Sequence, residues 1–191
     1  MLLYIHGFNS SPLSDKAQQA KAYFAKHHAD ERLEIPQLPS TPQDAVALLT
    51  QRVTAAVAAG EPLRFIGSSL GGYFASYLAE QYGGKAVLIN PAVKPYELFK
   101  DYLGEQINPY TGEHYQIVAE HQQQLLRFDT PVIFNPDRFF VLLQSGDEVL
   151  DYQQAMHKYH CCRMLVEAGG NHSFDGFEHQ LADVCRFLGL S

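Results

Sequence analysis

Two adjacent serines stand among three glycines in the stretch GSSLGG at residues 67–72, directly after an apolar run. A chain that turns sharply from a strand into a helix needs small residues two positions before and after the apex, because larger side chains would collide there. That spacing fits Ser69, which has Gly67 and Gly71 on either side, whereas centring the pattern on Ser68 would place larger residues at both positions. We therefore predict that Ser69 is a nucleophile displayed at the apex of such a turn.

A serine hydroxyl is a weak nucleophile near neutral pH and needs a base that removes its proton. The chain has nine histidines. His172 differs from the others because it lies in the glycine-rich segment EAGGNHSF, directly after the last predicted strand. Most of the other histidines fall in helical segments, where solvated side chains are the rule. We therefore predict that His172 is the base.

The base in turn needs a carboxylate that fixes its tautomer and stabilises its charged form. Three carboxylates follow the predicted strand at 139–143 in the segment QSGDEVLD, namely Asp147, Glu148 and Asp151. Gly146 permits a turn before Asp147, whereas Asp151 precedes a helical segment and fits the role of its N-cap. Glu148 is expected to point elsewhere if Asp147 points inward. We predict that Asp147 is the acid.

A site for acyl transfer also needs N–H donors for the charge that develops on the carbonyl oxygen. The first predicted strand ends in YIHGFN, where Gly7 lets the backbone approach a substrate. We predict that the backbone N–H groups of Phe8 and Leu70 form this oxyanion hole. His6 is interpreted as a residue that orients the loop rather than as a base.

Short apolar runs that alternate with amphipathic segments predict the scaffold for these residues. The strand-like runs lie at 2–5, 33–35, 63–66, 86–89, 139–143 and 164–166. Two helices are predicted to begin at Ser11-Pro12 and Thr41-Pro42, each with an N-cap followed by proline, and a third carries the stripe Phe177, Leu181, Val184 and Leu188. Strand–helix–strand repetition favours parallel pairing, so we expect a compact α/β fold with an open parallel sheet of about six strands and helices on both faces. Active sites in such sheets gather at the carboxyl ends of the strands.

One connection, between Pro91 and Pro136, is far longer than a single crossover helix needs. Within it the segments 96–103 and 113–128 look helical, and the turn NPYTG separates them. We expect a single domain over 1–191 with a small helical insertion at 92–135. The insertion would be either a cap over the site or a pair of surface helices.

Composition limits the partners. The chain of 191 residues has 14 Lys and Arg against 21 Asp and Glu, a net charge of −7, which disfavours nucleic acid and anionic membranes as partners. No apolar run approaches the roughly 18 residues that a membrane span needs, and the opening MLLYIHGF lacks the pattern of a secretory signal. We expect a soluble cytoplasmic protein with a small-molecule substrate, and the sequence leaves the oligomeric state open.

The three cysteines indicate a reducing compartment, because their number is odd and two of them are adjacent, which argues against a disulfide framework. An alternative is a metal site built from His160, Cys161, Cys162 and His172. We disfavour it because adjacent cysteines rarely offer tetrahedral geometry. No metal and no other cofactor is predicted.

The segments HGFNSSP, GSSLGGY, INPAVKPYEL, NPYTGE, SGDEVLDY and GGNHSF follow one another along essentially the whole chain. Through them the chain resembles the α/β-hydrolase superfamily, and more narrowly the small YqiA-type bacterial esterases. Ser69, Asp147 and His172 follow the order nucleophile, acid, histidine of that superfamily. The resemblance implies hydrolysis of carboxylic esters, extending to acyl thioesters, by these three residues. The chain departs from the superfamily in its size, so we expect a trimmed and wholly parallel sheet, and in reading HGFN where HGGG is common.

The leading hypothesis is a serine esterase that acts through an acyl-enzyme on Ser69. One alternative is an acyl-CoA thioesterase, in which Lys94 and Lys100 of the insertion would receive the phosphates. Another is a non-catalytic binding protein with an α/β-hydrolase-like fold. The complete set of nucleophile, base, acid and oxyanion loop argues against the last of these.

Overall fold

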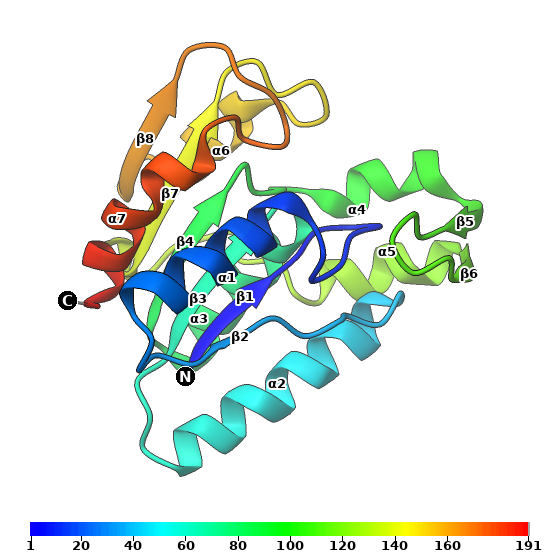
Figure 1. The fold of residues 1–191 in the computed structure, drawn as a ribbon. Coiled ribbons are helices and arrows are strands. Elements are labelled where there is room, and N and C mark those ends of the chain that lie inside the picture. The colour runs from blue at the N-terminus through cyan, green and yellow to red at the C-terminus, as the bar shows by residue number, and fades with distance from the viewer. Residues whose placement is uncertain (191) are drawn as a thin grey trace.

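Six strands form the main sheet, and all of them run parallel in the order β2-β1-β3-β4-β7-β8 (Figure 1). The structure is a computed structural model that describes residues 1–190. The strands are β1 (Leu2–Ile5), β2 (Leu33–Glu34), β3 (Arg64–Ser68), β4 (Lys85–Ile89), β7 (Phe139–Gln144) and β8 (Arg163–Glu167). Each of them lies on one of the predicted apolar runs. The expected open, wholly parallel sheet of six strands is confirmed.

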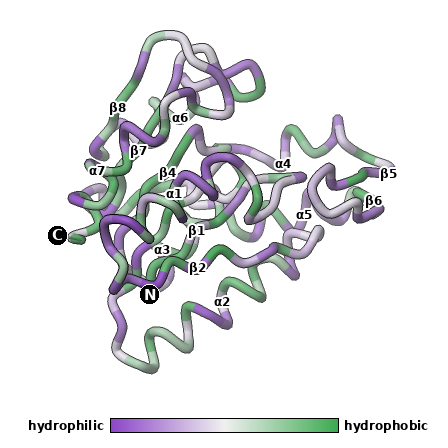
Figure 2. The backbone as a smooth tube through the Cα atoms, viewed as in Figure 1, coloured by the Kyte–Doolittle hydropathy of each residue, from purple (hydrophilic) through white to green (hydrophobic). Residues whose placement is uncertain are grey.

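Helices cover both faces of this sheet, as expected. Helices α1 (Asp15–His27) and α7 (Phe177–Leu188) pack side by side on one face (Figure 1). The other face carries α2 (Pro42–Ala58), α3 (Leu70–Tyr82) and α6 (Tyr152–Lys158). Because successive side chains of a strand point to opposite faces, the apolar strands supply both cores at once. Figure 2 shows hydrophobic stretches along the central strands β3, β4 and β7.

The two predicted N-caps have different outcomes. Thr41 caps α2 as predicted, because the backbone N–H of Asp44 donates to its Oγ1 at 3.2 Å. The prediction for Ser11 is wrong, since α1 begins at Asp15. The Oγ of Ser11 instead accepts from the N–H of Leu13 at 2.9 Å. A serine hydroxyl can close such a short turn as readily as it caps a helix, and sequence alone does not separate the two.

Replacing Thr41 with alanine should lower the free energy of unfolding by about 1 kcal/mol, because an N–H of the first turn of α2 then loses its acceptor. Ser14→Ala is the matched control, since Ser14 stands at the N-cap of α1 without a side-chain capping bond. Its effect should stay within about 0.5 kcal/mol. Urea denaturation of the two variants measures the difference, and equal losses would contradict the assignment.

The insertion at 92–135 is not purely helical, contrary to prediction. It contains α4 (Pro95–Leu98), the 3₁₀ helix η1 (Phe99–Tyr102), an antiparallel hairpin of β5 (Gly104–Ile107) and β6 (His114–Ile117), and α5 (Ala119–Leu126). A second 3₁₀ helix, η2 (Pro136–Arg138), then leads into β7. The helix predicted over 113–128 is therefore wrong in its first part and correct in its second. The turn between the two segments is confirmed, because the side-chain oxygen of Asn108 accepts from the N–H groups of Tyr110 and Thr111.

The insertion lies on the side of the sheet toward which β1 points (Figure 1). The hydroxyl of Tyr73 on α3 donates to the carbonyl oxygen of Leu125 on α5 at 2.7 Å, and this bond is buried. The backbone N–H of Gln43, at the start of α2, donates to the side chain of Gln124 at 3.1 Å. These contacts hold α5 against the helices of one face and place the hairpin near the carboxyl ends of the strands.

Candidate active site

Ser69 stands alone between the end of β3 and the start of α3, with backbone angles φ 56° and ψ −121°. A positive φ is unfavourable for a residue with a side chain, so the surrounding structure must hold it in place. The neighbouring glycines explain how the chain achieves this. A Cβ on Gly67 would run into the carbonyl group of Gly71, and one on Gly71 would run into the carbonyl oxygen of Ile5. Both glycines are therefore sterically required for the turn that displays Ser69.

Three loops bring the predicted nucleophile, base and acid together. The Nε2 atom of His172 lies 3.1 Å from the Oγ of Ser69, and its Nδ1 lies 2.8 Å from the Oδ2 of Asp147. An ionised carboxylate can only accept a hydrogen bond, so Nδ1 carries the ring proton of the neutral imidazole. The lone pair of Nε2 then faces the hydroxyl of Ser69, which is the position of a general base.

Asp147 is well suited to remain ionised in this arrangement. Its side chain is only 1% exposed, and burial by itself raises the pKa of a carboxyl group. Hydrogen bonds from His172 and from the backbone N–H groups of Leu150 and Val149 outweigh burial and hold the pKa of Asp147 below its usual value. The carboxylate is thus fixed by three donors and presents one oxygen to the imidazole.

The lowered pKa of Asp147 predicts a dependence of stability on pH. Because the folded protein holds this proton more weakly than the unfolded chain does, the stabilisation is complete above the unfolded pKa of about 3.9. It is lost as the pH falls through the lower pKa of the folded state. We expect the free energy of unfolding to fall more steeply on acidification in the parent than in Asp147→Asn, which cannot titrate. Urea denaturation over about pH 3 to 6 measures both slopes, and equal slopes would refute the prediction.

Two buried polar residues that the sequence analysis did not identify hold the loop that carries His172. The side-chain amide of Asn90 donates to the carbonyl oxygens of Asn171 and His172 at 3.0 and 3.1 Å. The side-chain oxygen of Gln144 accepts from the backbone N–H groups of Asn171 and Asp175 at 3.1 and 2.9 Å. Each of the two residues directly follows or ends a buried apolar strand, and a polar residue in that place is the signal that could have found them.

The other two carboxylates of the same loop have distinct roles. Glu148, expected to point elsewhere, accepts from the backbone N–H of His172 at 2.9 Å, and this bond is the main reason that its pKa is lowered. Asp151 caps α6 as predicted, because it accepts from the backbone N–H of Gln153 at 3.0 Å. The hydrogen bonds of the imidazole ring within residues 1–190 go to Asp147 and Ser69, and neither of these two carboxylates takes part in them.

The predicted oxyanion donors lie next to the nucleophile in the chain fold. A Cβ added to Gly7 would come within 3.2 Å of the Cβ of Ser69, so the loop after β1 passes directly against the serine. Within residues 1–190 the backbone N–H groups of Phe8 and Leu70 have no hydrogen-bond acceptor. Both donors are therefore available to the carbonyl oxygen of a substrate.

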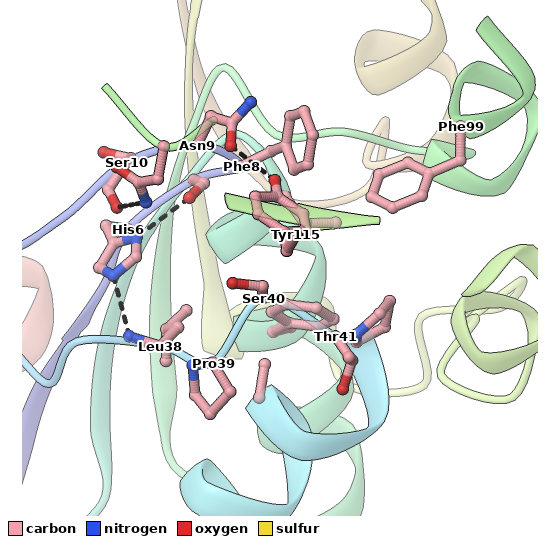
Figure 3. Close-up of a pocket in the computed structure, with 16 residues that line it drawn as sticks. His6, Phe8, Asn9, Ser10, Leu38, Pro39, Ser40, Thr41, Phe99 and Tyr115 are labelled. Atoms are coloured by element: carbon pink, nitrogen blue, oxygen red, sulfur yellow. Dashed lines mark hydrogen bonds between the residues drawn. The ribbon is translucent and has the colours of Figure 1, made fainter. Parts of the chain in front are cut away.

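His6 holds the same loop from its inner side, as Figure 3 shows. Its Nε2 accepts from the backbone N–H of Leu38 at 3.1 Å, so its Nδ1 carries the proton and donates to the carbonyl oxygen of Gly7 at 3.0 Å. Burial lowers the pKa of His6 and outweighs the bond to Gly7 that favours the charged form. Both ring nitrogens are occupied, which agrees with a role in orienting the loop.

The hairpin of the insertion contacts the loop from outside. In Figure 3 the hydroxyl of Tyr115 on β6 donates to the side-chain oxygen of Asn9. The backbone of Asn9 has a positive φ of 48°. The ring of Phe8 packs on that of Phe99 with a centroid distance of 5.2 Å. The loop after β1, which carries the predicted oxyanion donor Phe8, is therefore held between His6 on one side and the insertion on the other.

The four residues of the alternative metal site do not come together. His172 is engaged with Ser69 and Asp147, whereas the Nδ1 of His160 lies 2.9 Å from the carbonyl oxygen of His157. Within residues 1–190, no group of three or more His, Cys, Asp or Glu side chains is placed to hold a metal ion.

The sheet and the loops above it define the class of the protein. The turn with Ser69 follows β3, Asp147 follows β7 and His172 follows β8, all at the carboxyl edge of one parallel sheet, which is the α/β-hydrolase fold. Residues 1–189 match the model of a family described as an uncharacterised protein family, UPF0227, and the chain belongs to that family. The predicted α/β-hydrolase fold is confirmed.

Several solved structures share this fold. Est1E from Butyrivibrio proteoclasticus, solved with bound ferulic acid, has a TM-score of 0.68 at 13% identity, over 98% of this chain and 87% of that chain. A monoacylglycerol lipase from Paleococcus ferrophilus has a TM-score of 0.69 at 14% identity, over 100% of this chain and 94% of that chain. An esterase domain from a Rhodothermus marinus protein has a TM-score of 0.67 at 17% identity, over 98% and 84%. At these identities the likeness establishes the fold alone.

Proposed function

We propose that the protein is a serine esterase that hydrolyses carboxylic esters of small molecules through an acyl-enzyme on Ser69. The observation that carries the proposal is the chain of contacts from the Oγ of Ser69 to Nε2 of His172, at 3.1 Å, and from Nδ1 to Asp147, at 2.8 Å. The similar structures include an esterase domain and a monoacylglycerol lipase, which support the same class of reaction.

The geometry supports a reaction in two halves. In the first, the Oγ of Ser69 attacks the ester carbonyl carbon while His172 takes the hydroxyl proton, and the N–H groups of Phe8 and Leu70 stabilise the oxyanion. The tetrahedral intermediate collapses, the bond to the alcohol breaks, and the alcohol leaves with the proton from His172. In the second half, His172 removes a proton from water, which attacks the acyl group and releases the acid and Ser69.

Labelling with a fluorophosphonate probe tests the proposal, because such probes phosphonylate a serine only when it is activated. The parent protein should take up one probe per chain, on the peptide that contains Ser69. Ser69→Ala should take up none. Equal labelling of parent and variant would contradict the proposal.

The acyl-CoA thioesterase has weaker support than the esterase. Lys94, one of the two lysines considered for the phosphates, pairs with Glu97 at 3.4 Å. Rates on an oxygen ester and a thioester with the same acyl group separate the two reactions. A clearly higher rate on the thioester would mean that the protein is a thioesterase rather than an esterase.

We also propose that the protein works in a reducing compartment, the cytoplasm. Its three cysteines are free, and Cys161 is exposed, a thiol that an oxidising compartment would not preserve. The net charge of −7 supports the expectation that nucleic acid is not a partner. Among residues 1–190, no helix is long and apolar enough to cross a membrane. Cell fractionation tests the location, and recovery outside the cytoplasm would contradict it.

A further inference from the structure

A cavity of about 260 Å³ opens beside Ser69, on the side of the oxyanion loop that faces the start of α1. Ser69, His172 and Lys16, which stands near the start of α1, all border it. The lining is mostly polar and includes Ser10, Ser14 and Ser173. The proposed ester chemistry does not by itself require a lysine in this place.

Lys16 is a cation without a paired anion. Its Nζ donates to the carbonyl oxygen of Ser173 at 2.8 Å, and within residues 1–190 no carboxylate lies within ion-pair distance of it. Burial lowers the pKa of Lys16 to about 8, against the opposing charges of Asp147 and Asp15. A partly desolvated ammonium group with two unused N–H donors favours an anionic ligand, because a charge-assisted hydrogen bond would replace the lost solvation.

One further feature of the same cavity favours an anion. The helix α1, with 13 residues, directs its positive N-terminal end toward the cavity. The carboxylate of Asp15, which also borders the cavity, is exposed to solvent.

We propose that this cavity binds an anionic group of the ester substrate, a carboxylate or a phosphate, and that Lys16 determines the specificity for it. The inference rests on the proposed esterase function and adds the class of substrate. The anion would bind beside Lys16 while the ester carbonyl reaches Ser69.

Matched substrates test the proposal. We would compare the 4-nitrophenyl monoester of adipic acid, which keeps a free carboxylate, with the same ester whose second carboxyl is methylated. A third ester, with a phosphonate in place of the carboxylate, distinguishes the two kinds of anion. The quantity measured is the ratio of kcat/KM on the charged ester to kcat/KM on the neutral one. A charge-assisted hydrogen bond predicts a ratio of about tenfold or more in the parent protein.

Lys16→Met removes the charge and keeps much of the side-chain volume, and Lys16→Gln keeps a polar group. Both should lower the ratio by about tenfold, chiefly through KM of the charged ester. Lys21→Met is the matched control, because Lys21 lies on the same helix with an exposed side chain outside the cavity. It should keep the ratio of the parent.

Each outcome decides the inference. If Lys16 only anchors the loop through Ser173, its loss slows both esters alike, and an unchanged ratio overturns the proposal. A parent enzyme that hydrolyses both esters without preferring a charged one also overturns it and leaves the esterase function standing. If the parent hydrolyses none of the esters, the proposed function itself has failed and the inference fails with it. The ratio to the neutral ester is measured for the carboxylate ester and for the phosphonate ester. The larger of these two ratios identifies the preferred anion as a carboxylate or a phosphate.

Discussion

Ser69→Ala is expected to lower turnover by a factor on the order of 10⁶, the loss typical of removing the nucleophile of a serine hydrolase. The Oγ of Ser69 is the atom that faces Nε2 of His172 at 3.1 Å, so its removal leaves the base without a proton to accept. The residual rate would come from the oxyanion donors and from substrate binding. Steady-state hydrolysis of a 4-nitrophenyl ester measures the effect.

Ser68→Ala is the control for this experiment, because Ser68 is the adjacent residue and ends β3. Its side chain is buried, and it is not part of the contact chain from Ser69 to Asp147. The control should retain most of the turnover. A large loss in Ser68→Ala together with a small loss in Ser69→Ala would show that the nucleophile is Ser68 and that our assignment is wrong.

Asp147→Asn is expected to lower turnover by a factor on the order of 10⁴ with the fold intact. The asparagine side chain has nearly the same shape, but it presents an amide that can donate where the carboxylate accepted from Nδ1 of His172. The imidazole then has no fixed tautomer with its lone pair toward Ser69, and the imidazolium loses its counter-charge. Both effects act on the chemical step, so kcat should fall.

Asp151→Asn is the matched control from the same loop. Asp151 caps α6 by accepting from the N–H of Gln153, and asparagine caps a helix nearly as well. Its turnover should stay within a few-fold of the parent. Circular dichroism shows whether both variants remain folded. If Asp151→Asn were crippling and Asp147→Asn mild, the acid would be misassigned even though the esterase reaction survived.

The turn that displays Ser69 could be predicted from the sequence because its requirements are local. Gly67 and Gly71 are needed for steric reasons that involve only a few neighbouring residues, and the flanking apolar strand and helix are visible in the same short stretch. The strands of the main sheet could be predicted for a similar reason, since buried parallel strands are continuous apolar runs. The α/β class followed from the alternation of apolar strand-like runs with amphipathic helical segments.

The hairpin in the insertion could not be predicted in this way. The segment that forms β6 carries two aromatic or β-branched residues, Tyr115 and Ile117, but it directly precedes a helix and shares its polar composition. What makes it a strand is pairing with β5 across the turn at 108–112, and this pairing is a tertiary preference that short windows do not carry.

The contacts that hold the loop with His172 also could not be predicted from the sequence. Asn90 and Gln144 hydrogen-bond to residues around His172 that are distant in the chain, and the order of the strands brings them together. From general rules of catalysis, the sequence predicted that Ser69, Asp147 and His172 act together, and the structure brings these three residues together. The sequence did not identify the residues whose roles depend on which loops become neighbours.

The contact between the hairpin and the oxyanion loop has a thermal consequence. Within residues 1–190, strands β5 and β6 pair only with each other, and an isolated two-stranded hairpin is at best marginally stable. Yet the hairpin holds the loop after β1, which carries the predicted oxyanion donor, by two hydrogen bonds. Tyr115 donates to the side chain of Asn9, and Asn108, in the turn of the hairpin, donates to the carbonyl oxygen of Ser10. On heating, the hairpin should detach while the main sheet is still intact, and the loop would lose its alignment with Ser69. Inactivation would then precede denaturation, so the working temperature of the enzyme would be limited by a small appendage rather than by its core.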